Sequence, residues 1–191
     1  AAQGCILGLE LADGADAESL SQAYGVFASE ALAHHPNYRP ESVNLDGWEP
    51  TAQAWQTLFP GISIIRCFLH SLLKVGQYCR RDKDLWTQLR QKLWHAYRSI
   101  NPRQMAQRLR RIREWCSKHN CSASVQSKVQ SMASKASAFS ATFAHPDGYR
   151  TSNQVDRLIN FQDRLLYAMQ YFHGTHRSAR QALRAMALIW N

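Results

Sequence analysis

The stretch VNLDGWEPTAQAWQTLFPGISIIRCFLH, residues 43–70, decides the fold through the order of its elements. Residues 42–46, SVNLD, which overlap its start, predict a short β-strand that ends in the acid Asp46. Residues 47–59 carry apolar side chains at helical spacing, which predicts a helix, and a Pro-Gly pair then breaks that helix. Residues 62–69, ISIIRCFL, are the most β-prone run in the chain and predict another strand. The stretch therefore has the order strand, acid, helix, strand.

The same alternation extends toward the N-terminus. Residues 4–11, GCILGLEL, predict a buried strand that enters a turn. From Asp16 the apolar residues follow a helical period with acidic residues in the first turn, and this pattern ends before HHPNYRP. Strands and helices that alternate in this way are typical of an α/β layer, in which parallel strands are joined by right-handed connections. We therefore predict an α/β fold for the first third of the chain.

The strand signal stops after residue 70. Residues 85–100 and 102–118 both carry apolar side chains at helical intervals and predict two basic helices. The Ser/Ala-rich segment 120–144 fits either a marginal helix or a flexible connection. A long helix is expected from a cap at Ser152 or Asn153 to the glycine at 174, followed by an apolar helix over residues 178–190.

Composition narrows the class of protein. A chain of 191 residues with 45% hydrophobic residues fits one ordinary globular domain. Its apolar runs are far shorter than the roughly 20 residues that a membrane-spanning helix needs, and no secretory signal is recognisable. The five cysteines are an odd number at irregular spacing, which favours reduced thiols inside a cell over a disulfide framework. No Gly-rich phosphate loop supports nucleotide hydrolysis.

The net charge of +9 is unevenly distributed. Residues 1–73 contain two basic and eight acidic residues, whereas residues 74–128 contain fourteen basic and three acidic residues. The remaining residues, 129–191, contain seven basic and three acidic residues. A segment with this excess of positive charge attracts polyanions, because neutralised phosphates release their counterions. A solvated helix face explains the charge equally well.

Three aspartates are candidates for chemistry. Asp46 follows a predicted strand, at the edge of an α/β sheet where ligands bind, although an aspartate there can equally cap the next helix. Asp156 lies in the first turn of its predicted helix, where a favourable interaction with the helix dipole is the simpler explanation. Asp163 lies seven residues later, close to the same helical face, and is a rival to Asp156.

Cys67 and His70 have the spacing C-x-x-H, which is half of a zinc site at most. The other cysteines and histidines do not supply a convincing second pair, so a structural zinc ion is not expected. A buried strand residue and a hydrogen-bonded strand end explain the two residues better. The tryptophans that lie among basic residues are expected to fill a core, although they could also stack on bases. These are Trp86, Trp94 and Trp115.

Two segments carry a resemblance to a known family. Residues 43–70 resemble the segment of Mutator-like and related bacterial transposases that holds the second catalytic Asp, an AW helix, an FP turn and a strand that ends in C-x-x-H. Residues 149–191, which begin YRTSNQVDRLINFQDRLL, are similar to the closing catalytic helix of these proteins, where an Asn precedes the third acid by three residues. Asp46, Asp156 and Asn153 match the two acids and the Asn. The family more usually has Glu where this chain has Asp156.

The resemblance implies a partial ribonuclease-H-like core, with a short central sheet and flanking helices, a large basic all-α insertion and C-terminal helices. The implied boundaries are 1–70 for the α/β core, 71–145 for the insertion, and 146–191 for the catalytic helix and the helix after it. Asp46 and Asp156 would hold Mg²⁺ or Mn²⁺, supported by Asn153, Cys67 and His70. The insertion would hold DNA through basic side chains. These are Lys74, Arg80, Arg81, Arg103, Arg108, Arg110, Arg111 and Arg113.

The function expected from the resemblance is metal-dependent DNA cleavage and strand transfer by a DDE/D transposase of the insertion-sequence type. In the family the first acid lies on an earlier strand, which would place it before residue 1, so the chain is expected to be truncated at both ends and active only when full length. Its partners would be transposon ends, target DNA and further copies of itself, in the nucleoid of a bacterial cytoplasm. The alternatives are a catalytically inactive DNA-binding remnant and a ribonuclease-H-like nuclease that acts on another substrate.

Overall fold

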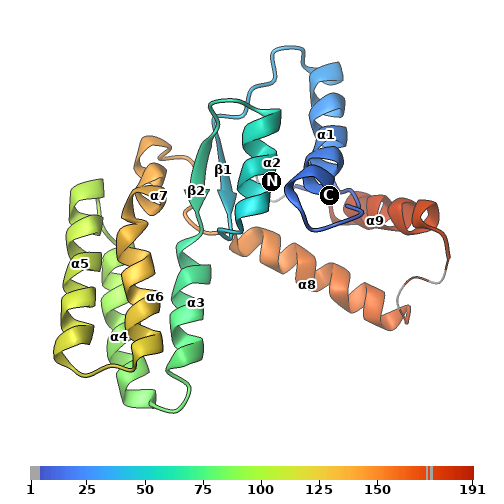
Figure 1. The fold of residues 1–191 in the computed structure, drawn as a ribbon. Coiled ribbons are helices and arrows are strands. Elements are labelled where there is room, and N and C mark those ends of the chain that lie inside the picture. Colours follow the sequence, from blue (N-terminus) through green and yellow to red (C-terminus); the bar gives the residue numbers. More distant parts are fainter. Residues whose placement is uncertain (1–4, 171, 173) are drawn as a thin grey trace. The chain divides into compact units, whose positions relative to one another are not determined.

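A computed structural model describes residues 5–170, 172 and 174–191 of the chain (Figure 1). The described elements, in chain order, are α1 (Ala17–His34), β1 (Ser42–Leu45), α2 (Glu49–Leu58), β2 (Ser63–Arg66), α3 (Phe68–Tyr78), α4 (Lys83–Tyr97), α5 (Pro102–Lys118), α6 (Ala123–Ser134), α7 (Ala136–Ser140), the 3₁₀ helix η2 (Ala141–Ala144), α8 (Asn153–Ala168) and α9 (His176–Trp190). None of the helices described is both long enough and apolar enough to cross a membrane.

The chain forms two compact units. The unit that we call the terminal unit consists of residues 1–41, 47–62 and 152–191. The unit that we call the sheet unit consists of residues 42–46 and 63–151. The sheet unit contains both described strands together with helices α3 to α7 and η2, and the terminal unit contains α1, α2, α8 and α9.

The sheet unit contains a parallel pair of strands, as its sequence predicts. β1 pairs with β2 in parallel, and the register runs from Ser42 opposite Ser63 to Leu45 opposite Arg66. Leu45 and Ile65 are buried, whereas the other residues of the two strands are half-buried. Parallel strands need a long crossover connection, which here contains α2. The fold is mostly helical with this small sheet, and belongs to the α/β class.

Strand β2 is shorter than predicted. The expected strand at 62–69 ends at Arg66, and Phe68 already begins α3. The reason is the spacing of the apolar residues Phe68, Leu72 and Val75, which lie on one face of a helix and are all buried. His70, which we expected at a strand end, therefore lies in the first turn of α3.

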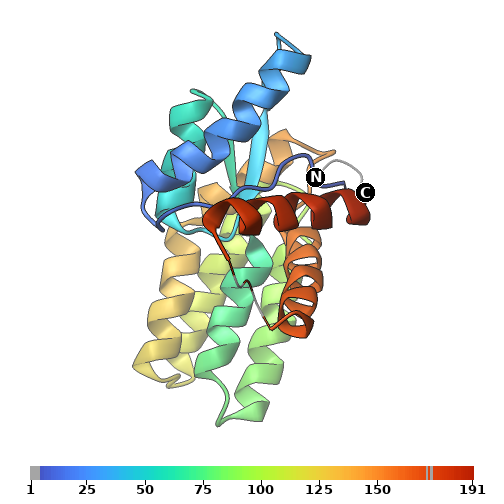
Figure 2. The ribbon, with the colours of Figure 1, turned by 90° about the vertical axis from the view of Figure 1, so that its right-hand side faces the viewer.

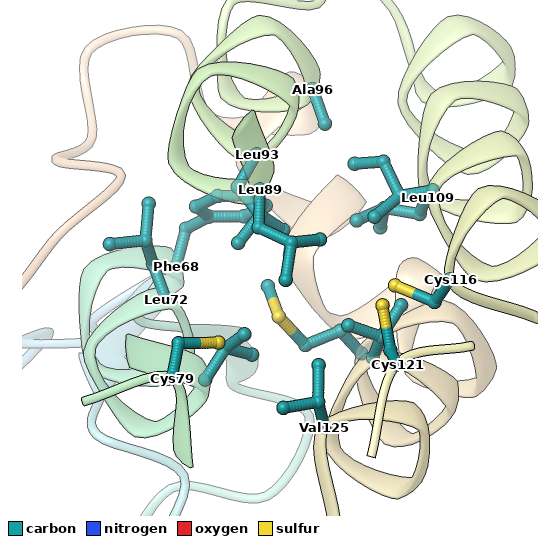
Figure 3. Packing of buried hydrophobic residues seen from close by; sticks show 14 of the residues in the cluster. Phe68, Leu72, Cys79, Leu89, Leu93, Ala96, Leu109, Cys116, Cys121 and Val125 are labelled. Atoms are coloured by element: carbon teal, nitrogen blue, oxygen red, sulfur yellow. The ribbon is translucent and has the colours of Figure 1, made fainter. Parts of the chain in front are cut away.

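The helices of the sheet unit enclose one apolar core, and α3, α4, α5 and α6 run alongside one another in two perpendicular views (Figures 1 and 2). Figure 3 shows side chains from different helices meeting in this core, among them Leu72, Leu89, Leu109 and Val125. Burial of such side chains stabilises the unit by roughly 1.5–3 kcal/mol each relative to exposure. Trp86, Trp94 and Trp115 are half-buried and pack against the core, which confirms the expected packing role.

The N-terminus of α5 follows from its local sequence. Asn101 is the N-cap, and its Oδ1 accepts a hydrogen bond from the backbone N–H of Gln104 at 2.8 Å. Pro102 occupies the first helical position, where its missing N–H costs nothing. Along the helix, apolar side chains recur at the spacing of a buried face. They are Met105, Leu109, Ile112 and Cys116, each at most 4% exposed.

The Ser/Ala-rich segment 120–144, for which a helix and a flexible connection were both open, is helical over most of its length. Helices α6 and α7 and the 3₁₀ helix η2 follow one another there. Ser122 caps α6, and the buried residues Val125, Val129 and Met132 recur at helical spacing. These three side chains pack into the common core of the sheet unit. This packing stabilises the helical conformation of a segment whose own amphipathicity is weak.

Aromatic side chains join α1 to α2 in the terminal unit. The ring of Trp55 stacks on Phe59 at a centroid distance of 5.7 Å and lies 5.2 Å from Tyr24. Tyr38 makes edge-to-face contacts with Phe27 at 5.9 Å and with Phe59 at 6.0 Å. Aromatic pairs at these distances add about 0.5–1.5 kcal/mol each beyond the area that they bury. This cluster explains why the two helices pack closely.

The strand predicted at 4–11 is wrong for the residues described. Residues 5–12 belong to neither a helix nor a strand. Instead, the backbone of Ile6 pairs with the side-chain amide of Asn191, which accepts from the Ile6 N–H at 2.7 Å and donates to its carbonyl at 2.9 Å. This exchange satisfies the same two backbone groups that a neighbouring strand would satisfy.

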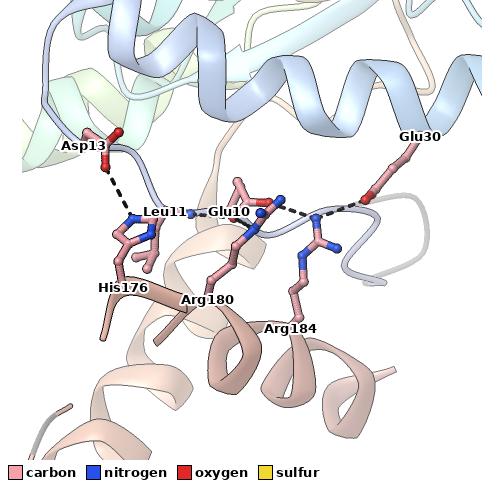
Figure 4. A network of polar contacts seen from close by, with 7 residues as sticks. All are labelled: Glu10, Leu11, Asp13, Glu30, His176, Arg180 and Arg184. Carbon is pink, nitrogen blue, oxygen red and sulfur yellow. Dashed lines mark hydrogen bonds and ion pairs between the residues drawn. The ribbon is translucent and has the colours of Figure 1, made fainter. Parts of the chain in front are cut away.

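Ion pairs also hold this segment to α9 (Figure 4). The carboxylate of Glu10 accepts hydrogen bonds from Arg180 and from Arg184, and Arg184 also contacts Glu30 at 3.0 Å. Burial acts to raise the pKa of Glu10, but the hydrogen bonds from the two guanidinium groups outweigh it, so the pKa is lowered from its usual value of 4.5. The network therefore favours the charged form of Glu10.

The C-terminal helices differ in part from expectation. α8 ends at Ala168, before the glycine at 174 that we expected to end it, and Gln170 has a positive φ of 56°. α9 begins at His176, because Thr175 and Ser178 form a reciprocal capping box. The Phe161 ring on α8 contacts Trp190 on α9 at 5.1 Å.

Candidate functional site

Asp46 lies at the carboxyl edge of the parallel strands. The Cys67 N–H donates to the Leu45 carbonyl at 2.7 Å, so the two strands end side by side and Asp46 follows β1 directly. Gly47 then turns the chain with a φ of +92°, a conformation that favours glycine. The N-cap of α2 is Trp48, so the alternative interpretation of Asp46 as that cap is wrong. The Asp46 side chain is exposed and accessible to a ligand.

Cys67 and His70 form a contact at the same edge. Cys67 is the residue before α3 and is fully buried, whereas His70 is half-buried in the first turn of the helix. The Cys67 Sγ and the His70 Nδ1 are 3.3 Å apart, so the C-x-x-H spacing brings the two side chains together. A thiol beside one ring nitrogen restricts the orientation of the imidazole.

Asn44 is a polar residue of this edge that the sequence reasoning missed. Its Nδ2 donates to the Tyr149 carbonyl at 2.6 Å, whereas its Oδ1 is buried and accepts no hydrogen bond from the described residues. Asn44 lies on β1, two residues before Asp46. The alternation Asn44, Leu45, Asp46 is the signal that could have identified it.

The residues matched to the catalytic helix lie on α8, in the terminal unit. Asn153 is the first residue of α8 and is exposed, and Asp156 lies in the first turn and is half-buried. Asp163 is exposed, two turns further along. Because Asp46 belongs to the sheet unit and Asp156 to the terminal unit, their convergence on shared metal ions stays a prediction.

Six of the eight basic residues proposed for DNA are exposed. Arg108 is half-buried, and its Nη1 donates to the His95 carbonyl near the end of α4 at 2.6 Å, which gives it a structural role. Arg113 is also half-buried. Arg110 contacts Glu114 one turn away at 3.3 Å, a surface pair of small energetic value. The exposed residues are Lys74, Arg80, Arg81, Arg103, Arg110 and Arg111.

The sequence reasoning also missed Arg90 on α4 and Arg98, the C-cap residue of that helix. Arg90 and Arg98 line a shallow groove together with Gln91, Trp94 and His95. Both arginines were counted in the net charge of residues 74–128. Only the structure shows that they line the same groove.

The thiols of the helical core are buried. Cys79, Cys116 and Cys121 are each at most 5% exposed (Figure 3). Burial, together with the neighbouring Cys121, raises the pKa of the Cys116 thiol to about 12. Burial likewise raises the pKa of Cys79. Buried thiols act as small apolar side chains.

Within the described residues, no group of three or more His, Cys, Asp or Glu side chains is arranged to hold a metal ion. The expectation of no structural zinc and the expectation of magnesium at Asp46 and Asp156 both stay predictions. No protein-family model, curated protein or solved structure matches this chain.

Proposed function

We propose that this chain is the catalytic region of a DDE/D transposase, which cleaves DNA and transfers strands with the help of divalent metal ions. The proposal rests on the resemblance of residues 43–70 and 149–191 to such enzymes. The observation that supports it most is the position of Asp46, an exposed carboxylate directly after β1, at the edge where both parallel strands end.

The neighbourhood of Asp46 suits a reaction on phosphodiesters. Carboxylate oxygens are the ligands that Mg²⁺ prefers, and two such ions activate the attacking oxygen and stabilise the leaving one when bound. Asp46 and Asp156 would hold them. The contact between Cys67 and His70 restricts the orientation of a polar imidazole that follows β2 by four residues.

The basic helices of the sheet unit suit the same substrate. Residues 74–128 carry a net charge of +11, and most of the arginines and lysines that we assign to DNA are exposed. Such a surface neutralises phosphates and holds a duplex with salt-dependent affinity. It would keep DNA bound while the carboxylates act on it.

The test is Mg²⁺-dependent strand transfer of transposon-end DNA by the full-length protein and its Asp46→Asn variant. We expect the variant to lose at least about a thousandfold in rate, because a metal ligand is removed. The matched control is Asp84→Asn, an exposed aspartate in the first turn of α4, which should leave the rate within about threefold. Equal activity of Asp46→Asn and wild type would exclude Asp46 from the mechanism.

A second candidate function is DNA binding without cleavage, as in a repurposed transposase. The exposed basic side chains of the sheet unit favour it, since they need no metal to bind phosphates. Salt-dependent duplex binding by a full-length protein that shows no metal-dependent cleavage would support this candidate.

A further inference from the structure

A groove on α4 has the composition of a nucleic-acid contact. Its lining residues are Arg90, Gln91, Trp94 and His95 of α4 and Arg98, the C-cap residue of that helix. Arg90, Trp94 and Arg98 are spaced four residues apart, so they form a single row, with Gln91 and His95 beside it. At 1.5 Å per residue the two arginines are about 12 Å apart along the helix axis.

The groove is positively charged and open to a partner. Arg90 and Arg98 are both exposed, and no carboxylate lines the groove. Neither guanidinium forms an ion pair with any side chain in the described part of the chain. Guanidinium groups that no carboxylate neutralises are suited to bidentate binding of phosphate oxygens.

The charge at the end of α4 also favours an anion. The C-terminus of a helix carries a partial negative charge that would repel phosphates. Here Arg108 donates to the His95 carbonyl at 2.6 Å, and Arg150 donates to the carbonyls of Tyr97 at 3.3 Å and Ser99 at 3.2 Å. Two guanidinium groups therefore cover the terminal carbonyls beside the groove and remove this repulsion.

Trp94 adds an aromatic surface between the two arginines. It is half-buried and makes an edge-to-face contact with Tyr97, with ring centroids 5.2 Å apart and planes at 89°. Tyr97 in turn packs against Phe68 of the core at 5.6 Å. The indole is thus held in one orientation, and its exposed part faces the groove. A fixed aromatic ring between cations is the arrangement on which an unpaired base stacks.

We infer that the α4 groove binds a single-stranded segment of nucleic acid, with phosphates on Arg90 and Arg98 and a base against Trp94. This inference deepens the proposed function and rests on it, because it identifies where an unpaired DNA strand is held. A duplex would contact only the arginines, since its bases are stacked inside. An acidic protein would likewise contact the arginines without stacking on the Trp94 indole.

The test is fluorescence anisotropy with a labelled oligothymidylate of about 20 nucleotides, in EDTA, using the full-length protein. We expect Arg90→Ala/Arg98→Ala to weaken binding at least about tenfold and to reduce the slope of log K against log salt by about 1.4, which is about 0.7 per lost phosphate contact. The charge-matched control is Arg164→Ala/Arg177→Ala, two exposed arginines of the terminal unit, which should change affinity less than about threefold.

The role of Trp94 is tested with Trp94→Phe, which keeps an aromatic ring in the packing. It should weaken binding of oligothymidylate but leave unchanged the binding of an abasic strand of equal length. The inference is overturned if both double variants lose affinity equally, if Trp94→Phe affects both strands alike, or if polyglutamate competes as well as DNA. All binding is measured without metal. If the protein binds the oligonucleotide through the groove but shows no strand transfer, the proposed function is contradicted and the groove is still supported as a binding site.

Discussion

The Sγ atom of Cys67 lies 3.3 Å from the Nδ1 atom of His70, which links the last residue before α3 to the first turn of that helix. Cys67 is fully buried and also donates its N–H to the last residue of β1. The imidazole is therefore tied, through one buried residue, to the strand edge that carries Asp46. This relationship gives His70 a defined position at the candidate site.

We predict that His70→Ala lowers Mg²⁺-dependent strand transfer by the full-length protein at least about tenfold, because a positioned hydrogen-bond donor is lost. The free energy of unfolding should change by less than about 1 kcal/mol, since His70 is only half-buried. The control is Gln77→Ala, an exposed residue on the same helix. Loss of activity that parallels loss of folded protein in circular dichroism would contradict the assignment.

Glu10→Gln should destabilise the terminal unit by about 1–2 kcal/mol at neutral pH, because two arginines lose their shared carboxylate. The lowered pKa of Glu10 means that its contribution is complete above the usual value of 4.5 and is lost as pH falls through the folded-state pKa. Urea unfolding at a series of pH values measures this. The variant should show a smaller loss of stability on acidification than wild type, and Glu30→Gln, at a 50% exposed side chain, should behave nearly as wild type.

Leu89→Ala should destabilise the helical core of the sheet unit by about 2–5 kcal/mol, because Leu89 is fully buried and the substitution leaves a cavity. Leu73 on α3 is 51% exposed, so Leu73→Ala should cost less than about 1 kcal/mol. Denaturant unfolding followed by circular dichroism compares the two. Similar midpoints for both variants would contradict the packing described here.

The cysteines should differ in reactivity toward an alkylating reagent at about pH 8, because the thiolate is the reactive form. Cys5 is half-buried and should be modified first. Cys116, 1% exposed and with its pKa raised to about 12, should react only on unfolding. Peptide mass mapping over time separates the sites. Modification of Cys116 in the folded protein as fast as of Cys5 would be inconsistent with a closed core.

Several helices and one strand could be predicted from local patterns in the sequence. A strand close to β1, predicted at 42–46, the helices at α1, α2, α4 and α5, and the α/β class all follow from apolar periodicity and turn residues. The end of β2 could also have been predicted from the sequence. Phe68, Leu72 and Val75 recur at helical spacing, and this pattern competes with the β-propensity of the run ISIIRCFL.

Other features depend on contacts between distant residues. Residues 5–12 have the composition of a strand, but their backbone is satisfied by the Asn191 amide and their acid by arginines on α9, which no local pattern reveals. Asn44 and the α4 groove were missed for the same reason, because both are defined by which neighbours the fold brings together. The sequence thus predicts that Asp46 follows a strand, whereas the polar residues around Asp46 depend on contacts that the fold makes.

The most direct test of the central claim, that Asp46 and Asp156 hold metal ions together, is strand transfer by the single and double Asn variants of the full-length protein. Each single variant should lose at least about a thousandfold in rate and the double variant hardly more, because ligands of one site act as a unit. Asp163→Asn should remain within about threefold of wild type. Wild-type activity of Asp156→Asn, or loss of activity in Asp163→Asn instead, would contradict the account.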